Sequence, residues 1–288
     1  MEKRTVDELI ALYQLEPSVK DVFVEGSVDR AFVETVLEHM GVADAQVTEI
    51  ELVDVPSETL APVTSCSGNR QCVLALALEL ERSSKVDLTR RVCCVADADD
   101  EAGRPPTVRG ALLLYTDFSA IELYAFSGDT VQRYFDQVVL GFPMSGAEAL
   151  RALEPVLLET SLSRRLNQAL GLATAPVDAA DDCAIRGSSI ELDLERLTFR
   201  FLSKASALRR KDEYCRERER LRSTLPADAR LWVHGEDFVE LLHWLIFRLR
   251  GGPRTVPRDL LGRVLLLAVP LEEAAAQPLF VELKLRLS

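Results

Sequence analysis

The sequence predicts an α/β fold, with a mostly parallel sheet flanked by helices in residues 1–145 and a mainly helical domain in residues 146–288. Two observations carry this prediction. Short β-rich runs alternate with helix-periodic segments in the first half, a pattern typical of βαβ units. After about residue 145 the apolar residues recur mainly at helical spacing, which indicates a helical lobe.

The first βα unit begins with an apolar run. Residues 21–24 (DVFV) predict a strand, and residues 29–40 place apolar side chains along one face of a helix. Gly41 is suited to end that helix. Residues 47–55 alternate apolar and acidic side chains, which predicts a strand with one wet face near an edge of the sheet.

A second unit follows the same order. Residues 69–82 predict a helix, and residues 91–96 (RVCCVA) have the β-branched, thiol-rich composition of a strand buried on both faces. A turn at residues 103–106 separates this run from residues 111–115, which predict another buried strand.

The second half predicts helices over residues 147–159, 162–170, 194–221 and 237–249. A polar linker rich in small residues covers residues 174–189. No internal repeat or low-complexity tract is visible.

The charge of the chain is acidic and uneven. The formal net charge is −12; residues 1–150 hold 12 basic and 26 acidic side chains, whereas residues 151–288 hold 22 and 20. A protein that coats nucleic acid nonspecifically needs a dense Lys/Arg surface, so the composition excludes that class. A substrate held by metal ions and a local basic surface stays compatible with the charge.

We expect a cytoplasmic protein that does not span a membrane. No apolar run approaches the roughly 18 to 20 residues of a membrane helix, and Asp7 and Glu8 interrupt the segment where a signal peptide would be apolar. The cysteines form no C-x-x-C pair, and the three histidines give no zinc spacing, so reduced thiols are expected: Cys66, Cys72, Cys93, Cys94, Cys183 and Cys215.

Two acidic clusters follow predicted strands. Glu25-Gly26 ends the first strand, and Asp29 comes four residues later at the start of the helix. Asp97 and Asp99 follow the strand at residues 91–96, with Asp100 and Glu101 directly after them. In an open parallel sheet, ligands bind at the carboxyl ends of the strands.

Converging carboxylates repel one another, and a hard divalent cation removes that penalty. We therefore predict a Mg²⁺ or Mn²⁺ site at this edge of the sheet. The alternative for each single residue is a solvated loop acid or a helix cap, and Asp29 by itself is most simply a first-turn acid favoured by the helix dipole.

The same residues carry a resemblance. The segment VFVEGSVDRAF (residues 22–32) resembles the first motif of the Toprim domain, and VCCVADADD (residues 92–100) resembles its Asp-x-Asp motif. The stretch YTDFSAIELY (residues 115–124) resembles one Toprim subgroup, long described only as a domain of unknown function. This subgroup includes the Toprim effector of PARIS anti-phage systems and is more distantly similar to OLD-family nucleases. The resemblance covers roughly residues 20–250.

The resemblance implies metal-dependent phosphodiester cleavage. Carried over by position, Glu25, Asp97 and Asp99 would be the catalytic set, and Asp29 and Glu122 would complete a second metal site. It also implies an anti-phage effector that cleaves RNA, with tRNA as one candidate, or DNA, and that an ABC-type ATPase partner holds inactive until triggered. A homodimer in the active state is a further implication. The chain contains no P-loop motif of its own.

Two segments of the second half are also candidates. LWVHGEDFVELL (residues 231–242) resembles the subgroup's Gly-x-Asp motif, although Glu236 stands where relatives are expected to carry a basic or imidazole side chain. His234 could assist a leaving group, but a lone histidine is more often structural. A basic run between Lys204 and Arg222 could contact a phosphate backbone, or form a solvated helix laced with Glu/Arg pairs. Its candidate nucleic-acid ligands are Arg209, Arg210, Lys211, Arg216 and Arg218.

The acidic clusters are also compatible with other classes of function. A Toprim scaffold without catalysis could use the same acids to shape an interface with a partner ATPase. A phosphatase with an Asp nucleophile would place Asp-x-Asp on the first strand, which this chain does not do. A glycosyltransferase that holds a nucleotide sugar through Asp-x-Asp leaves Glu25-Gly26 unexplained.

Overall fold

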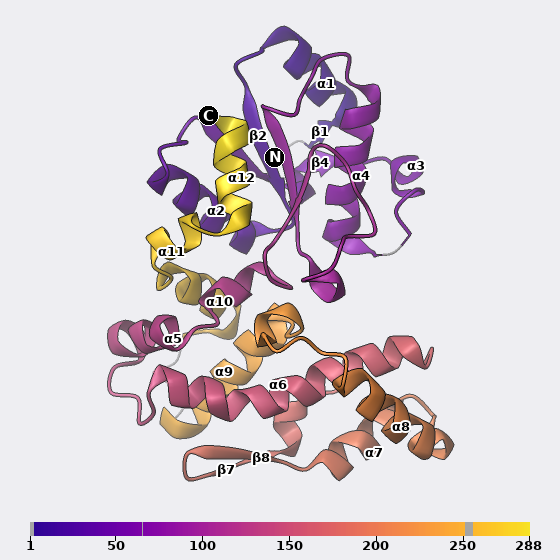
Figure 1. The fold of residues 1–288 in the computed structure, drawn as a ribbon, viewed down its shortest axis with the longest axis vertical. Helices are drawn as coiled ribbons and strands as arrows, with labels where there is room; N and C mark the ends of the chain where they lie inside the picture. Colours follow the sequence, from indigo (N-terminus) through magenta and orange to yellow (C-terminus); the bar gives the residue numbers. More distant parts are fainter. Residues whose placement is uncertain (1–2, 65, 251–255) are drawn as a thin grey trace. The chain divides into compact units, whose positions relative to one another are not determined.

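The computed structural model describes residues 3–64, 66–250 and 256–288 (Figure 1). The chain divides into two compact units. The first unit comprises residues 1–121 and 269–288, and the second comprises residues 122–268.

A four-stranded parallel sheet forms the centre of the first unit. Its strands lie in the order β3 (Ala45–Glu49), β2 (Lys20–Val24), β5 (Val92–Ala96) and β6 (Leu113–Tyr115), and each neighbouring pair is parallel. The predicted α/β class and mostly parallel sheet are thus confirmed. The predicted edge position of the strand near residue 47 is also confirmed, because β3 is paired only with β2 in this sheet.

Helices cover both faces of the sheet (Figure 1). On one face, α1 (Val6–Leu15) and α4 (Gly68–Ser83) share an apolar core with the strand residues Phe23 and Cys94. On the other face lies α2 (Ser27–His39), with the C-terminal helix α12 (Pro278–Leu287) packed against α2 and β5. This cover on both faces explains why β2 and β5 are almost continuously apolar.

The C-terminal residues return to the first unit. Helices α11 (Leu271–Ala275) and α12 (Pro278–Leu287) both pack against α2. The ring of Phe280 is fully buried and meets Phe32 edge to face, with 5.7 Å between ring centroids. The division therefore differs from the predicted boundary at residues 145/146: it falls after residue 121, and the last 20 residues cover the sheet instead of extending the helical domain.

The predicted strand over residues 47–55 is interrupted. A 3₁₀ turn at Ile50–Leu52 ends β3, and β4 (Val53–Asp54) then pairs with β1 (Arg4–Thr5) in a separate two-stranded sheet. Ile50 and Val53 are both buried, so the apolar positions that suggested one strand belong to the core on either side of the turn. Short helices occur at Ser57–Leu60 (α3) and Asp99–Glu101 (η2).

The second unit is mainly helical, as predicted for this part of the chain. Its long helix α6 (Gly146–Ala169) runs through both segments predicted as separate helices, residues 147–159 and 162–170. The polar residues between them do not break it, because Thr160 donates to the carbonyl of Val156 and buried Ser161 donates to the carbonyl of Trp232 at 2.8 Å.

The predicted helix over residues 194–221 is broken into α7 (Leu194–Lys204), a 3₁₀ turn at Leu208–Arg210 and α8 (Lys211–Arg222). Ser206 ends α7 in the left-handed region with φ 54°, and the Ala207 N–H bonds back to the carbonyl of Leu202. This is a Schellman-type helix end. The linker predicted at residues 174–189 contains a 3₁₀ turn (Ala179–Asp182) and the first strand of an antiparallel hairpin, β7 (Cys183–Arg186) and β8 (Ser189–Leu192).

The other elements of this unit are the turn η3 (Ile121–Ala125, which starts at the last residue of the first unit), α5 (Gly128–Tyr134), a π turn at Phe135–Val139, η7 (Ala229–Leu231), α9 (Gly235–Arg250) and α10 (Arg258–Leu267). Within the described ranges, no helix is long and apolar enough to span a membrane. All six cysteines are free thiols, as expected.

Candidate metal centre

The candidate site lies where the order of the strands reverses. From β2 the chain moves outward to β3, and it then returns to β5 on the opposite side of β2 before reaching β6. The carboxyl ends of β2 and β5 therefore flank a topological switch point, the usual ligand-binding crevice of an open α/β sheet. Glu25 follows β2 directly and Asp97 follows β5 directly.

The structure joins these two acids. Oε1 of Glu25 accepts the backbone N–H of Asp97 at 2.8 Å, so the carboxylate after β2 holds the start of the loop after β5. Oδ1 of Asp97 in turn accepts the N–H of Ile121 at 3.1 Å. The bond to Oε1 leaves Oε2 of Glu25 as an oxygen for a proton or a cation.

Asp29 acts as a helix cap. Its Oδ2 accepts the N–H of Gly26 at 2.7 Å, which closes the first turn of α2. Asp29 is thus a first-turn acid of α2, the simplest interpretation of this residue by itself, and its role as a metal ligand stays a prediction. Asp29 nevertheless stays electrostatically coupled to the site, because its charge contributes to the raised pKa of Glu25.

The loop after β5 is held in a sparsely populated conformation. Asp99 has φ 46°, which is uncommon for a residue other than glycine, and its N–H donates to the carbonyl of Ser119 at 2.7 Å. The N–H of Ala98 donates to the buried hydroxyl of Thr116 at 2.9 Å. Backbone strain of this kind persists only where surrounding contacts impose it, and it is concentrated at functional sites.

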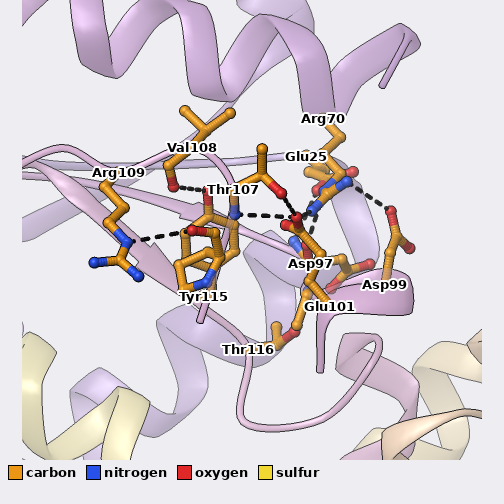
Figure 2. Close-up of polar contacts among 12 residues, drawn as sticks. Glu25, Arg70, Asp97, Asp99, Glu101, Thr107, Val108, Arg109, Tyr115 and Thr116 are labelled. Atoms are coloured by element: carbon orange, nitrogen blue, oxygen red, sulfur yellow. Dashed lines mark hydrogen bonds and ion pairs between the residues drawn. The ribbon is translucent and has the colours of Figure 1, made fainter. Parts of the chain in front are cut away.

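A basic side chain that the sequence interpretation missed lies among these acids. Arg70, in the first turn of α4, donates from Nε to the carbonyl of Asp97 at 2.9 Å. Its two Nη atoms lie 3.3 Å from Oδ2 of Asp99 and 3.3 Å from Oε2 of Glu101. Figure 2 shows the guanidinium directed at both carboxylates. The preceding residue, Asn69, donates to the carbonyl of Glu25 at 2.8 Å.

The position of Arg70 in the sequence is the feature that could have identified it as a site residue. Asn69-Arg70 forms a polar pair at the start of a helix whose later turns are apolar and buried. Two acidic clusters lie at the same end of the sheet. An Asn-Arg pair placed there is expected to donate hydrogen bonds to their carboxylates and to nearby carbonyl groups. Only the strand order, however, places the start of α4 beside Asp97.

Negative charge exceeds positive charge in the cluster. Burial raises the pKa of the Glu25 carboxyl to about 8, and the charges of Asp29 and Asp99 add to the rise. The Asp97 N–H and the Arg70 guanidinium oppose it. Burial likewise raises the pKa of Asp29 to about 6. The hydrogen bond from the Gly26 N–H lowers this pKa, and the charge of Glu49 raises it further. Carboxyl groups with strongly perturbed pKa values are typical of functional sites, and a divalent cation would relieve the repulsion between them.

The side chains fit a hard cation in donor chemistry but do not form a ready-made cage. Glu25, Asp97 and Asp99 offer carboxylate oxygens, the ligands that Mg²⁺ and Mn²⁺ prefer. Across the part of the chain that the structure describes, no three His, Cys, Asp or Glu side chains already surround one point as metal ligands. The carboxylates of Asp99 and Glu101 face Arg70 instead.

Two predicted metal or catalytic residues, Glu122 and His234, belong to the second unit. Glu122 begins it, and a Cβ at Gly262 of α10 would lie 3.8 Å from the Glu122 Cγ. Its role as a metal ligand, and that of His234 in catalysis, stay predictions. Asp237 of the Gly-x-Asp segment is buried in α9, and its two oxygens accept Nε and Nη2 of Arg164 on α6 at 2.8 and 2.7 Å.

The basic run separates into two groups. Arg218 is nearly buried and forms a bidentate ion pair with Glu159 of α6, and Arg210 pairs with Glu213 and with the carbonyl of Leu170. These contacts favour a structural role for both, in place of the predicted phosphate contacts. Arg209, Lys211 and Arg216 are exposed and have no such partner among the described residues.

Searches of protein-family models and of curated protein sequences find no match to this chain.

Proposed function

We propose that this protein is a metal-dependent nuclease that uses Mg²⁺ or Mn²⁺ and has a Toprim-like catalytic unit. The observation that supports this proposal best is the junction of Glu25 and Asp97 at the switch point between β2 and β5, inside a cluster with excess negative charge. A purely structural role would not need so many carboxylates at one end of the sheet, since each raises the cost of ionising the others.

The residues suit phosphodiester hydrolysis. Oε2 of Glu25, with Asp97 and Asp99, would hold the cation, which when bound polarises the scissile phosphate and lowers the pKa of the attacking water. The N–H of Asp97 keeps the Glu25 carboxylate turned towards the loop at Oε1. Burial is the main cause that raises the pKa of the Glu25 carboxyl to about 8. This carboxyl group therefore keeps its proton near neutral pH until a cation displaces it.

The biological setting follows from the resemblance alone. It favours an effector of a bacterial anti-phage system, located in the cytoplasm, that cleaves RNA, tRNA among the candidates, or DNA. An ABC-type ATPase partner would hold it inactive until triggered, and the active form would be a homodimer. The exposed basic residues Arg209, Lys211 and Arg216 are the remaining candidates for contact with a phosphate backbone.

The test is cleavage of tRNA and plasmid DNA with Mg²⁺ or Mn²⁺ by the purified chain and by Glu25→Gln. The matched control is Glu38→Gln, which makes the same chemical change at an exposed position near the end of α2. We expect Glu25→Gln to lower the cleavage rate at least 100-fold and Glu38→Gln to leave it unchanged. Equal cleavage rates in the wild type and both variants would show that the cleavage comes from a contaminant and would contradict the proposed function.

A non-catalytic scaffold that binds a partner ATPase is the alternative. It predicts no metal-dependent cleavage by the wild-type chain, whether alone or released from its partner.

A further inference from the structure

Arg70 lies among the acidic side chains that follow β5. Its side chain is 11% exposed, and it reaches three acceptors on one loop: the Asp97 carbonyl, the Asp99 carboxylate and the Glu101 carboxylate. These acceptors come from the segment directly after β5, which carries the predicted metal ligands. The guanidinium is thus the resident counter-charge of the loop.

The ion pair with Asp99 is the contact that matters for a metal. Oδ2 of Asp99 lies 3.3 Å from a guanidinium Nη atom, and an oxygen facing a guanidinium is electrostatically less available to a second cation. Glu101 is held differently, because its Oε1 also accepts the N–H of Thr107 at 3.0 Å. Release of Asp99 would therefore leave the guanidinium anchored to Glu101 and to the Asp97 carbonyl.

The arrangement accounts for two features of the site. The carboxylates of Asp99 and Glu101 are turned towards Arg70, which explains why the described acids do not surround one point. Arg70 also links the left-handed residue of the loop, Asp99, to α4 through the Asp99 carboxylate. An arginine that merely packed against the loop would not need to face both carboxylates.

We propose that Arg70 is a positioning residue that holds Asp99 in the metal-free protein and competes with the divalent cation for it. This inference rests on the proposed function, because it takes the acids after β2 and β5 to be metal ligands. The proposed role and a simple scaffolding role predict opposite changes in metal affinity when Arg70 is replaced. Removing a competing charge strengthens metal binding, whereas removing a support for the ligands weakens it.

The test measures the dissociation constant of Mn²⁺, added alone, by electron paramagnetic resonance of the free ion. The variants are Arg70→Met, which removes the charge and the donors, and Arg70→Gln, which removes the charge but keeps an amide that can donate to the Asp97 carbonyl. Arg70→Lys keeps the charge and serves as the conservative control. Because Arg70→Gln can still anchor the loop, it carries the test if Arg70→Met fails to fold.

We expect Arg70→Gln and Arg70→Met to bind Mn²⁺ about tenfold more tightly than the wild type, a change that corresponds to about 1.4 kcal/mol. Arg70→Lys should stay within about threefold of the wild type. Unchanged or weaker Mn²⁺ binding by both neutral variants would overturn the inference.

The same titration separates this failure from failure of the proposed function. If the wild type binds Mn²⁺ and Glu25→Gln does not, the metal site stands whatever Arg70 does. If neither wild type nor any Arg70 variant binds Mn²⁺ at these acids, the proposed function and this inference both fall.

Discussion

Replacement of Asp237 by Asn tests whether the Gly-x-Asp segment of the second unit has a structural role. Asp237 is 6% exposed and its carboxylate accepts two hydrogen bonds from the Arg164 guanidinium, so the change to Asn removes the negative charge from this buried ion pair. Breaking a buried ion pair by removing one partner costs about 3 to 5 kcal/mol. Because the Arg164 side chain is 27% exposed and water can partly solvate it, we expect about 3 kcal/mol, the lower end of that range.

The assay is urea unfolding followed by tryptophan fluorescence. Both tryptophans of the chain, Trp232 and Trp244, lie in the second unit, so the signal reports on the unit that contains the ion pair. The control is Glu236→Gln, an exposed neighbour that should change the free energy of unfolding by less than about 0.5 kcal/mol.

A double-mutant cycle with Arg164→Met completes the design. The two losses should be strongly non-additive, because once either partner is gone the other contributes little. A loss below about 1 kcal/mol for Asp237→Asn, or additive losses, would refute the structural assignment and return this segment to the candidate functional residues.

Three further predictions follow. Phe280→Ala should destabilise the first unit by about 3 to 5 kcal/mol, seen as faster hydrogen exchange in α2; unchanged exchange would contradict the packing of the C-terminal helix. Because burial raises the pKa of Glu25 from 4.5 to about 8, its contribution to stability is present below pH 4.5 and is lost as the pH rises to about 8. Metal-free thermal unfolding should therefore depend less on pH over this window in Glu25→Gln than in the wild type. Arg216→Ala should weaken nucleic-acid binding without loss of stability, and it should lower the number of ions released on binding, measured from the salt dependence, by about one. Arg218→Ala should mainly destabilise the second unit, because it breaks the ion pair with Glu159. The reverse pattern would refute the assignment of the basic run.

The sheet and its acidic ends could be predicted because they depend on local patterns. Apolar runs such as residues 91–96 mark buried strands, and acids placed directly after them lie at the carboxyl end of a parallel sheet whatever the strand order is. The meeting of Glu25 and Asp97 follows from that rule once β2 and β5 are neighbours.

The remaining features depend on contacts between distant parts of the chain. Arg70 contacts Asp97, which lies 27 positions further along the chain, and Phe280 contacts Phe32 across a much longer separation. No local sequence pattern can therefore predict either contact. The basic run was ambiguous for the same reason, since the partner of Arg218 is Glu159 on another helix. The break before α8 depends on one left-handed residue, Ser206, whose neighbours have ordinary helical composition.

Anomalous diffraction from crystals grown with Mn²⁺ tests the central claim most directly, because it locates the ion independently of activity. We predict a peak at the carboxyl ends of β2 and β5, with carboxylate oxygens of Glu25 and Asp97 about 2.0 to 2.6 Å from the ion, and no such peak in Glu25→Gln. An ordered wild-type structure with no Mn²⁺ at these carboxylates, or with the ion bound only elsewhere, would contradict the assignment of this cluster as the catalytic metal centre.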